Sequence, residues 1–308
     1  MTPLRIIFAG SPAAAVPSLR ALIEGPHEVI AVVTREDAPL GRKRVLTATP
    51  VAQLAEESGI HLIKANRLAT VATELVELDA DLGVVVAYGG LIREPVLSAP
   101  RHGWINLHFS LLPRWRGAAP VQRAIMAGDP EAGAAVFQLV EELDAGPVFA
   151  MESTSIGRVQ TAGHLLESLS ESGARLLARV VDEIATGTAV STPQRGEVTL
   201  APKLSLEDGR VDWTQPVSRI DSLLRGVTPE PGATTTLDGE RFKVLEAGIA
   251  HGVPRLDPGV VAQRGSAIVV GTGDEPLQLL TVQPSGKKAM PAADWWRGRG
   301  AQSATVFS

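Results

Sequence analysis

The sequence of 308 residues contains no cysteine. Disulfide bonds, thiolate metal ligands and a cysteine nucleophile are therefore excluded, and this composition suits a reducing intracellular compartment. No apolar run approaches the roughly 20 residues that a membrane-spanning helix needs, and the N-terminal residues lack the pattern of a signal peptide. These absences predict a cytoplasmic protein without a membrane partner.

An excess of basic charge is also missing. Lys and Arg together number 29, against 34 Asp and Glu, which gives a formal net charge of −5. A polyanionic partner must then be held by local basic clusters, and its binding should depend strongly on salt. Apolar residues make up 44% of the chain, which is enough to bury the cores of two domains.

Several common catalytic motifs do not occur in this sequence. There is no G-x-G-x-x-G after the first apolar run, no G-x-x-x-x-G-K-[ST], no H-E-x-x-H and no G-x-S-x-G. Dinucleotide-binding, nucleoside triphosphate-binding, zinc-protease and serine-hydrolase functions therefore lack their usual signatures.

Apolar strands alternate with amphipathic helices over the first part of the chain. This alternation predicts an α/β fold with a Rossmann-like, mostly parallel sheet and helices on both faces. Ligands of such sheets bind beyond the carboxyl ends of the strands. We expect strands at 4–9, 29–34, 82–87, 104–108, 134–140 and 148–151, and helices at 50–58, 69–78 and 162–184.

The pattern changes after the long helix expected at 162–184. A stretch rich in Thr, Gly and Pro follows, and then short strand-like runs broken by Gly, Pro and Asp. We therefore predict a catalytic domain at 1–187, a linker at 188–205 and a smaller C-terminal domain at 206–308. The short strands predict an OB-like β-barrel for that last domain.

Two polar side chains stand out in the strand expected at 104–108. The two-residue period of a strand places Asn106 and His108 on one face, at its carboxyl end. An amide donor beside an imidazole can hold a developing oxyanion and transfer a proton, and Asp144, in a turn between two expected strands, can orient the imidazole. A hydrogen-bonded core pair and an ordinary turn aspartate are the alternatives.

The pattern Asn106-x-His108, a Ser-Leu-Leu-Pro run after it and a downstream Asp144-x-Gly146 turn resemble the active site of the folate-dependent formyltransferases. The resemblance implies that Asn106, His108 and Asp144 are the catalytic triad, that 10-formyltetrahydrofolate is the co-substrate and that no metal is required. It also implies two folate-binding segments, which are Ser110, Leu111, Leu112 and Pro113, and Ala87, Tyr88, Gly89, Gly90, Leu91 and Ile92.

Further matches at 8–12, 115–122, 201–203 and 283–288 resemble the members of that family that formylate tRNA. They imply formyl transfer to the α-amine of initiator methionyl-tRNA by an enzyme of translation initiation. We expect the protein to be a monomer. One departure is Ala135, where the family commonly has Thr. The expected tRNA contacts are Arg42, Lys43 and Arg44 in the loop 35–49, together with Lys203, Lys287 and Lys288.

Other functions remain compatible with these residues. The acceptor of the same chemistry would be a small amine, such as glycinamide ribonucleotide or an amino-sugar nucleotide, or water, as in formyltetrahydrofolate hydrolases. A non-catalytic RNA-binding protein on the same scaffold is the alternative of a different class. For Arg42, Lys43 and Arg44, a solvated run of charges is the simpler structural explanation.

Overall fold

The computed structural model describes residues 2–41, 43–299 and 305–308. These residues form two compact units. The first comprises residues up to Pro120, Glu131–Ser155 and Leu166–Ala201, and the second Val121–Pro130, Ile156–Leu165 and the chain from Pro202 on. The expected linker 188–205 is thereby divided, since its residues up to Ala201 pack with the first unit.

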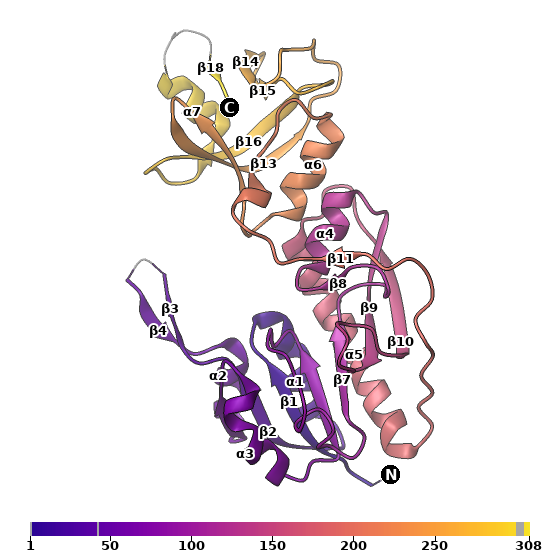
Figure 1. Cartoon of the computed structure of the whole chain (residues 1–308). Coiled ribbons are helices and arrows are strands. Elements are labelled where there is room, and N and C mark those ends of the chain that lie inside the picture. The colour runs from indigo at the N-terminus through magenta and orange to yellow at the C-terminus, as the bar shows by residue number, and fades with distance from the viewer. Residues whose placement is uncertain (1, 42, 300–304) are drawn as a thin grey trace. The chain divides into compact units, whose positions relative to one another are not determined.

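The first unit is built on a seven-stranded sheet with the strand order β10-β9-β7-β6-β1-β2-β5 (Figure 1). All neighbouring pairs from β7 to β5 are parallel, whereas β9 and β10 are antiparallel to their neighbours. This order confirms the predicted mostly parallel sheet. The strands are β1 (Arg5–Gly10), β2 (Glu28–Thr34), β5 (His61–Lys64), β6 (Leu82–Val86), β7 (Trp104–His108), β9 (Glu131–Gln138) and β10 (Val148–Ser155).

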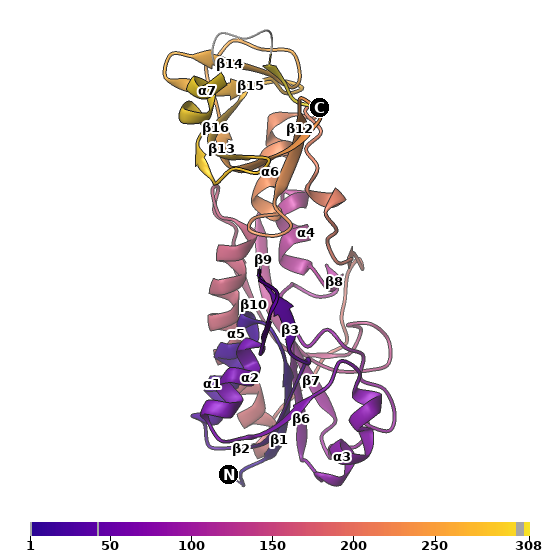
Figure 2. The same ribbon diagram turned by 90° about the vertical axis from the view of Figure 1, so that its left-hand side faces the viewer.

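Helices cover both faces of this sheet, as predicted. In Figure 2, α1 (Val16–Ile23), α2 (Pro50–Glu57) and α5 (Ala162–Thr186) lie on one face, and α3 (Ala72–Glu77) lies on the other. The strands are apolar on both sides because both sides are covered: every residue of β6 is buried. Short 3-10 helices at Ala13–Ala15 and Leu68–Val71 precede α1 and α3.

Two short strand pairs complete the first unit. A hairpin of β3 (Ala38–Leu40) and β4 (Val45–Thr47) extends from the carboxyl end of β2. Further along the chain, β8 (Arg116–Gly117) pairs in parallel with β11 (Leu200–Ala201). The second pair brings residues near 200 back to the segment that follows β7.

The second unit contains an antiparallel sheet with the order β12-β13-β16-β15-β14-β18, with β17 paired to β16. The sheet closes at its two ends, because Thr236 of the first strand and Ser308, two residues after the last strand, exchange backbone hydrogen bonds at 2.8 and 3.0 Å. This closure confirms the predicted barrel. The strands are β12 (Ala233–Leu237), β13 (Glu240–Ile249), β14 (Val260–Arg264), β15 (Ala267–Val270), β16 (Leu277–Pro284), β17 (Met290–Pro291) and β18 (Thr305–Val306).

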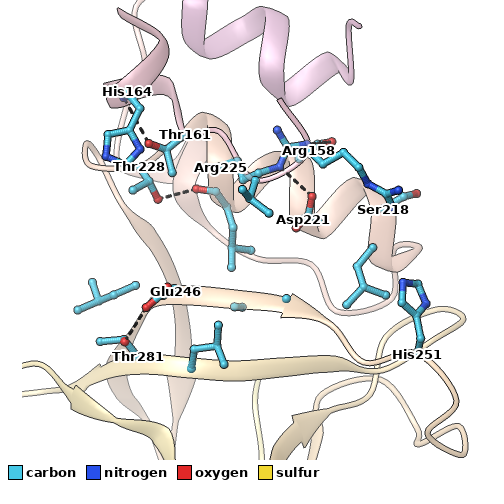
Figure 3. Close-up of a pocket in the computed structure, with 18 residues that line it drawn as sticks. Arg158, Thr161, His164, Ser218, Asp221, Arg225, Thr228, Glu246, His251 and Thr281 are labelled. Atoms are coloured by element: carbon cyan, nitrogen blue, oxygen red, sulfur yellow. Dashed lines mark hydrogen bonds and ion pairs between the residues drawn. The ribbon is translucent and has the colours of Figure 1, made fainter. Parts of the chain in front are cut away.

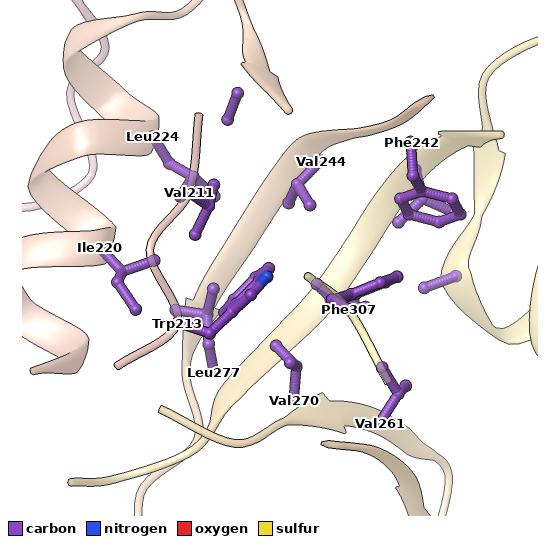
Figure 4. Packing of buried hydrophobic residues seen from close by; sticks show 14 of the residues in the cluster. Val211, Trp213, Ile220, Leu224, Phe242, Val244, Val261, Val270, Leu277 and Phe307 are labelled. Atoms are coloured by element: carbon purple, nitrogen blue, oxygen red, sulfur yellow. The ribbon is translucent and has the colours of Figure 1, made fainter. Parts of the chain in front are cut away.

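Aromatic side chains fill the core of the second unit (Figure 4). Phe242 lies with its ring 4.8 Å from that of Trp295 and 5.0 Å from that of Phe307. The buried Trp213 stacks on Phe307 and donates its indole N–H to Thr235 Oγ1 at 2.9 Å. Among the residues described in this unit, the barrel is accompanied by α4 (Pro120–Ala127), a 3-10 helix (Glu207–Gly209), α6 (Val217–Gly226) and α7 (Ala292–Arg299).

The carboxylate of Asp208 ties the chain after Ser205 to α4. It accepts hydrogen bonds from the amide and the hydroxyl of Ser205, both at 2.8 Å, and lies 2.9 Å from the Arg123 guanidinium. The hydrogen bonds from Ser205, aided by Arg123, hold the pKa of Asp208 below its usual value. The ionised carboxylate therefore stabilises the fold.

This lowered pKa predicts a pH dependence of stability. The contribution of Asp208 is fully present above the pKa of an unfolded aspartate, about 3.9, and is lost as the pH falls through the lower folded pKa. We expect the melting-temperature difference between the protein and its Asp208→Asn variant to be constant above about pH 5 and to shrink below it. Thermal unfolding measured from neutral to acidic pH tests this, with the exposed Glu240→Gln as control. If the melting temperatures of the protein and of Asp208→Asn differ by the same amount at every pH, ionisation of the Asp208 carboxylate does not contribute to stability.

Candidate active site

Strand β7 carries two polar side chains to the carboxyl end of the parallel sheet. Asn106 and His108 lie on the face that also buries Trp104, and they pair with Phe137 and Ala135 of the neighbouring β9. His108 is buried, with the ring of Phe137 edge-on to its imidazole. Asn106 is half-buried, and within the described part of the chain its side chain has no hydrogen-bond partner. Its amide is thus available to a ligand.

The His108 imidazole lies between two acceptors. Its Nε2 is 2.8 Å from the carbonyl oxygen of Trp115, and its Nδ1 is 3.8 Å from Oδ2 of Asp144. A neutral imidazole carries a single N–H, so only the imidazolium presents a donor to both partners. The longer distance to Asp144 is that of an ion pair and exceeds that of a hydrogen bond.

The Asp144 carboxylate is held by the backbone of β8. Oδ2 accepts a hydrogen bond from the Gly117 amide at 2.7 Å, and the residue is buried. One short segment therefore orients two side chains, since Trp115 contacts His108 and Gly117 contacts Asp144. Three non-glycine residues around this site, Ala87, Trp115 and Asp144, have φ between 46° and 61°. Backbone strain of this kind clusters at functional sites.

The loop that presents Asp144 depends on Gly146. A Cβ atom at this position would overlap the carbonyl oxygen of Gln138. We therefore expect Gly146→Ala to lower the free energy of unfolding by about 1–3 kcal/mol, the usual cost of overpacking. Urea unfolding measures it, with Gly248→Ala as control because an added Cβ there meets nothing within 4 Å. Equal unfolding midpoints for the two variants would contradict the crowding.

The first expected folate segment follows β7 directly. Ser110 is buried and donates its hydroxyl to the carbonyl oxygen of Arg114 at 2.6 Å, so this side chain stabilises its own turn. Leu112 and Pro113 are buried and joined by a cis peptide bond, whereas Leu111 is half-buried. The segment is adjacent in sequence to His108 and leads into β8.

The second expected folate segment, 87–92, has a mixed orientation. Ala87, Gly89 and Leu91 are exposed, and Gly90 is half-buried. Tyr88 and Ile92 belong instead to the core of the first unit. The Tyr88 hydroxyl donates to the Ala65 carbonyl oxygen at 2.6 Å, and burial raises the pKa of this phenol. The side chains of Tyr88 and Ile92 therefore support the segment from within.

Basic residues expected to contact RNA are exposed. Lys43 and Arg44 lie in the turn of the β3–β4 hairpin, and Arg42 lies outside the described residues. The base of this loop is fixed, because the hydroxyl of Thr34 contacts those of Ser11 at 3.3 Å and Thr49 at 2.7 Å. The turn is thus carried on a hairpin with an anchored base.

In the second unit Lys203, Lys287 and Lys288 are exposed. Two nearby arginines are engaged with acids, Arg297 with Asp294 and Arg299 with Asp238 at 3.0 Å. Trp295 and Trp296 pack with the core of this unit, as their apolar surface suggests.

A cavity of about 790 Å³ opens in the second unit, between α6 and strands β13 and β16 (Figure 3). Its polar groups largely satisfy one another. Arg225 pairs with Asp221 at 2.8 Å, and Thr281 donates to Glu246 at 3.0 Å. The residues 106, 108 and 144 are not among those that line it.

Neither a metal cluster nor a membrane span occurs in the ranges described. Among residues 2–41, 43–299 and 305–308, no three His, Asp or Glu side chains gather closely enough to hold a metal ion. Within the same ranges, no helix has the length and hydropathy to cross a bilayer.

Comparison with known proteins identifies the family. Residues 4–181 match the formyl transferase family, and residues 203–300 match the formyl transferase C-terminal domain. The chain belongs to the formyl transferase family. A curated methionyl-tRNA formyltransferase of Leifsonia xyli is 60% identical over 302 residues, which cover 97% of this chain and 99% of that protein. The protein of the same name from Clavibacter sepedonicus is 56% identical over 296 residues, covering 96% and 97%.

Solved structures of this formyl transferase fold agree at much lower identity. An N-formyltransferase from Helicobacter canadensis, in complex with folinic acid and dTDP-3-aminofucose, matches with a TM-score of 0.71 at 14% identity, covering 91% of this chain and 99% of that one. HypX from Aquifex aeolicus in complex with tetrahydrofolic acid matches with a TM-score of 0.62 at 17% identity, covering 100% and 51%. These likenesses show the shared fold.

The sequence patterns did not reveal one part of this candidate site. Residues 192–201 run beside the segment 113–119: the Trp115 amide donates to Thr199 Oγ1 at 2.9 Å, and the Arg116 amide to the Thr199 carbonyl oxygen at 2.9 Å. Gln194 in this stretch contacts the Asp144 loop. Its sequence signal is its place in the stretch 187–202, which is rich in Thr, Gly and Pro and is equally typical of a linker.

Proposed function

We propose that this formyl transferase moves the formyl group of 10-formyltetrahydrofolate to the α-amine of initiator methionyl-tRNA. The product would be N-formylmethionyl-tRNA for translation initiation. Relatives named methionyl-tRNA formyltransferase cover nearly the whole chain, including its second unit, and this supports the acceptor. The observation that carries the chemistry is the buried His108–Asp144 pair beside the free amide of Asn106 at the carboxyl end of β7.

The reaction begins with attack of the amine on the formyl carbon. An α-amine titrates at about 7.7–8.0, so a useful neutral fraction exists near pH 7. The tetrahedral intermediate carries an oxyanion. The amide of Asn106 would donate a hydrogen bond to it, and the imidazolium of His108 would donate its Nε2–H to it in place of the bond to the Trp115 carbonyl oxygen. Asp144 orients the imidazolium and balances its charge. A proton leaves the amine and reaches N10 of the folate as the C–N10 bond breaks.

Both substrates would be held by the segments described above. The segments 87–92 and 110–113 flank the strand ends where a folate would bind, and the exposed cations Lys43, Arg44, Lys203, Lys287 and Lys288, with Arg42, would contact tRNA phosphates. One copy of the chain supplies every proposed residue, so we expect a monomer. Because its acceptor belongs to translation, we expect the enzyme to act in the cytoplasm.

A comparison of acceptors tests the proposed function. Purified protein would be supplied with 10-formyltetrahydrofolate and, in turn, initiator methionyl-tRNA, glycinamide ribonucleotide, an amino-sugar nucleotide or water alone. We expect kcat/KM for methionyl-tRNA to exceed that for each alternative by several orders of magnitude. Faster transfer to a small amine, or faster release of formate, would identify one of the other formyltransferase activities. Binding of tRNA with no transfer to any acceptor would indicate a non-catalytic protein.

The basic turn of the β3–β4 hairpin gives a second prediction. With a net charge of −5, the protein must hold tRNA through few phosphate contacts. We expect the Lys43→Ala, Arg44→Ala double variant to raise KM for methionyl-tRNA and to reduce the slope of log KM against log salt by about 1 for each phosphate that is no longer neutralised. The control is Arg20→Ala, at an exposed position on α1. An unchanged salt slope in the double variant would remove these residues from the interface.

A further inference from the structure

We call the stretch 192–201 the return segment. It contacts the loop 141–147, which carries Asp144, and the strands next to that loop. At one end, Val148 and Thr192 exchange backbone hydrogen bonds at 2.8 and 2.9 Å. At the other end, β11 pairs with β8, whose Gly117 amide holds the Asp144 carboxylate. The return segment thus runs past the loop 141–147. It is bonded at its start to Val148, which follows the loop, and at its end to β8.

Gln194 is the residue of the return segment that contacts this loop. Its Nε2 donates to the carbonyl oxygen of Asp144 at 2.7 Å and to that of Gly146 at 2.9 Å. The two bonds hold the backbone on both sides of Ala145. The preceding residue, Asp144, has a φ of 46°. A carboxamide that binds both carbonyl oxygens restrains this uncommon backbone conformation.

Arg116 fixes which way the Gln194 amide faces. Its Nε and Nη2 lie 3.2 and 2.8 Å from Oε1 of Gln194, and its Nη1 lies 3.1 Å from Oε1 of Glu142, in the same loop. A guanidinium only donates and a carbonyl oxygen only accepts, so the amide satisfies all four contacts in a single orientation. The Arg116 side chain is 11% exposed, which limits competition from water.

We propose that Gln194 is a positioning residue for formyl transfer, which acts by holding Asp144 against His108. The inference rests on the proposed function only for its kinetic readout. Without the two bonds from Nε2, the Asp144 backbone is free to relax. The Gly117 amide then holds the carboxylate 3.8 Å from His108 without support from the backbone of the loop. Misplacement of a catalytic group by about 1 Å costs on the order of a hundredfold in rate.

Gln194→Glu is the sharpest test. A glutamate keeps an oxygen toward Arg116 but places its second oxygen against the two loop carbonyls, so both donated bonds are lost. We expect kcat for methionyl-tRNA to fall between about tenfold and a hundredfold, with KM for folate and for tRNA changed by less than about twofold. The near-isosteric Gln194→Met, which loses all these bonds without adding charge, should behave similarly. The control is Gln263→Glu, the same change at an exposed site.

Two further measurements separate positioning from a general structural role. Hydrogen–deuterium exchange should rise in the loop 141–147 of Gln194→Glu and stay unchanged in the sheet of the first unit. In single-turnover assays, adding Gln194→Glu to Asp144→Ala should cost less than about twofold, because the residue acts through Asp144. If the Asp144→Ala variant transfers formyl groups only at the background rate, the decision rests on the kcat, the KM values and the loop exchange of the Gln194→Glu single variant.

The outcomes also distinguish this inference from the proposed function. An active parent protein whose Gln194→Glu variant shows unchanged kcat and unchanged exchange overturns the positioning role alone. A loss of kcat matched by a large rise in both KM values, or an equal loss in the Asp144→Ala background, also overturns it. If the parent protein fails to formylate methionyl-tRNA but loop exchange rises in the variant, the proposed function fails while Gln194 still positions Asp144.

Discussion

Replacing His108 by alanine is expected to lower kcat for formyl transfer by about 10²–10⁴-fold, the usual contribution of a positioned acid or base. In the proposed mechanism, the variant loses both the proton donor and the cation that faces the oxyanion. Asn106→Ala removes one neutral donor, so we expect a loss of about 10²–10³-fold. Folate affinity should change much less, because in the proposed mechanism these side chains act chiefly on charge that develops in the transition state.

Single-turnover transfer with enzyme in excess measures these losses without interference from product release. Folate binding is followed separately by calorimetry. His61→Ala is the matched control, since His61 is exposed and pairs with Glu74 at 2.9 Å in another part of the first unit. A His108→Ala enzyme that turns over at the parental rate would remove His108 from the mechanism.

Phe242→Ala is expected to lower the free energy of unfolding of the second unit by about 3–5 kcal/mol. Phe242 is 1% exposed and lies within ring contact of both Trp295 and Phe307, so truncation opens a cavity at the centre of the barrel. The small barrel has few alternative ways to fill that cavity. Loss of one buried aromatic group should therefore be felt across the whole unit.

Urea unfolding, followed by tryptophan fluorescence, measures this effect because Trp213 and Trp295 lie in the same cluster. Leu206→Ala is the control: this leucine is 63% exposed, so its removal should cost less than about 0.5 kcal/mol. A loss below about 1 kcal/mol for Phe242→Ala would mean that the barrel core tolerates the cavity.

Hydrophobic periodicity predicts the centre of the first sheet well. The strand expected at 104–108 has the bounds of β7, because its apolar residues are buried on both faces. The extent of the edge strand β10 is predicted poorly. The pattern suggests a strand at 148–151, but β10 continues to Ser155 through exposed residues that are held by pairing with β9. Pairing between strands leaves no apolar signature at an exposed edge.

The same distinction applies to the site. A two-residue period is enough to place Asn106 and His108 on one face of β7. The contacts that hold Asp144 join residues far apart in the chain: Gly117 is 27 positions from Asp144, and Gln194 is 50 positions from Asp144 and 78 from Arg116. No local pattern encodes such contacts, so the return segment resembles a linker until the fold brings it to β8.

The fate of a labelled formyl group tests the central claim most directly. The protein would be given 10-formyltetrahydrofolate labelled in the formyl carbon together with initiator methionyl-tRNA for one turnover, and the ester would then be hydrolysed with mild base. With enzyme in excess, we predict that the label is recovered as N-formylmethionine in a yield close to the amount of methionyl-tRNA supplied. Label found only as free formate, or retained on the folate, would contradict the account.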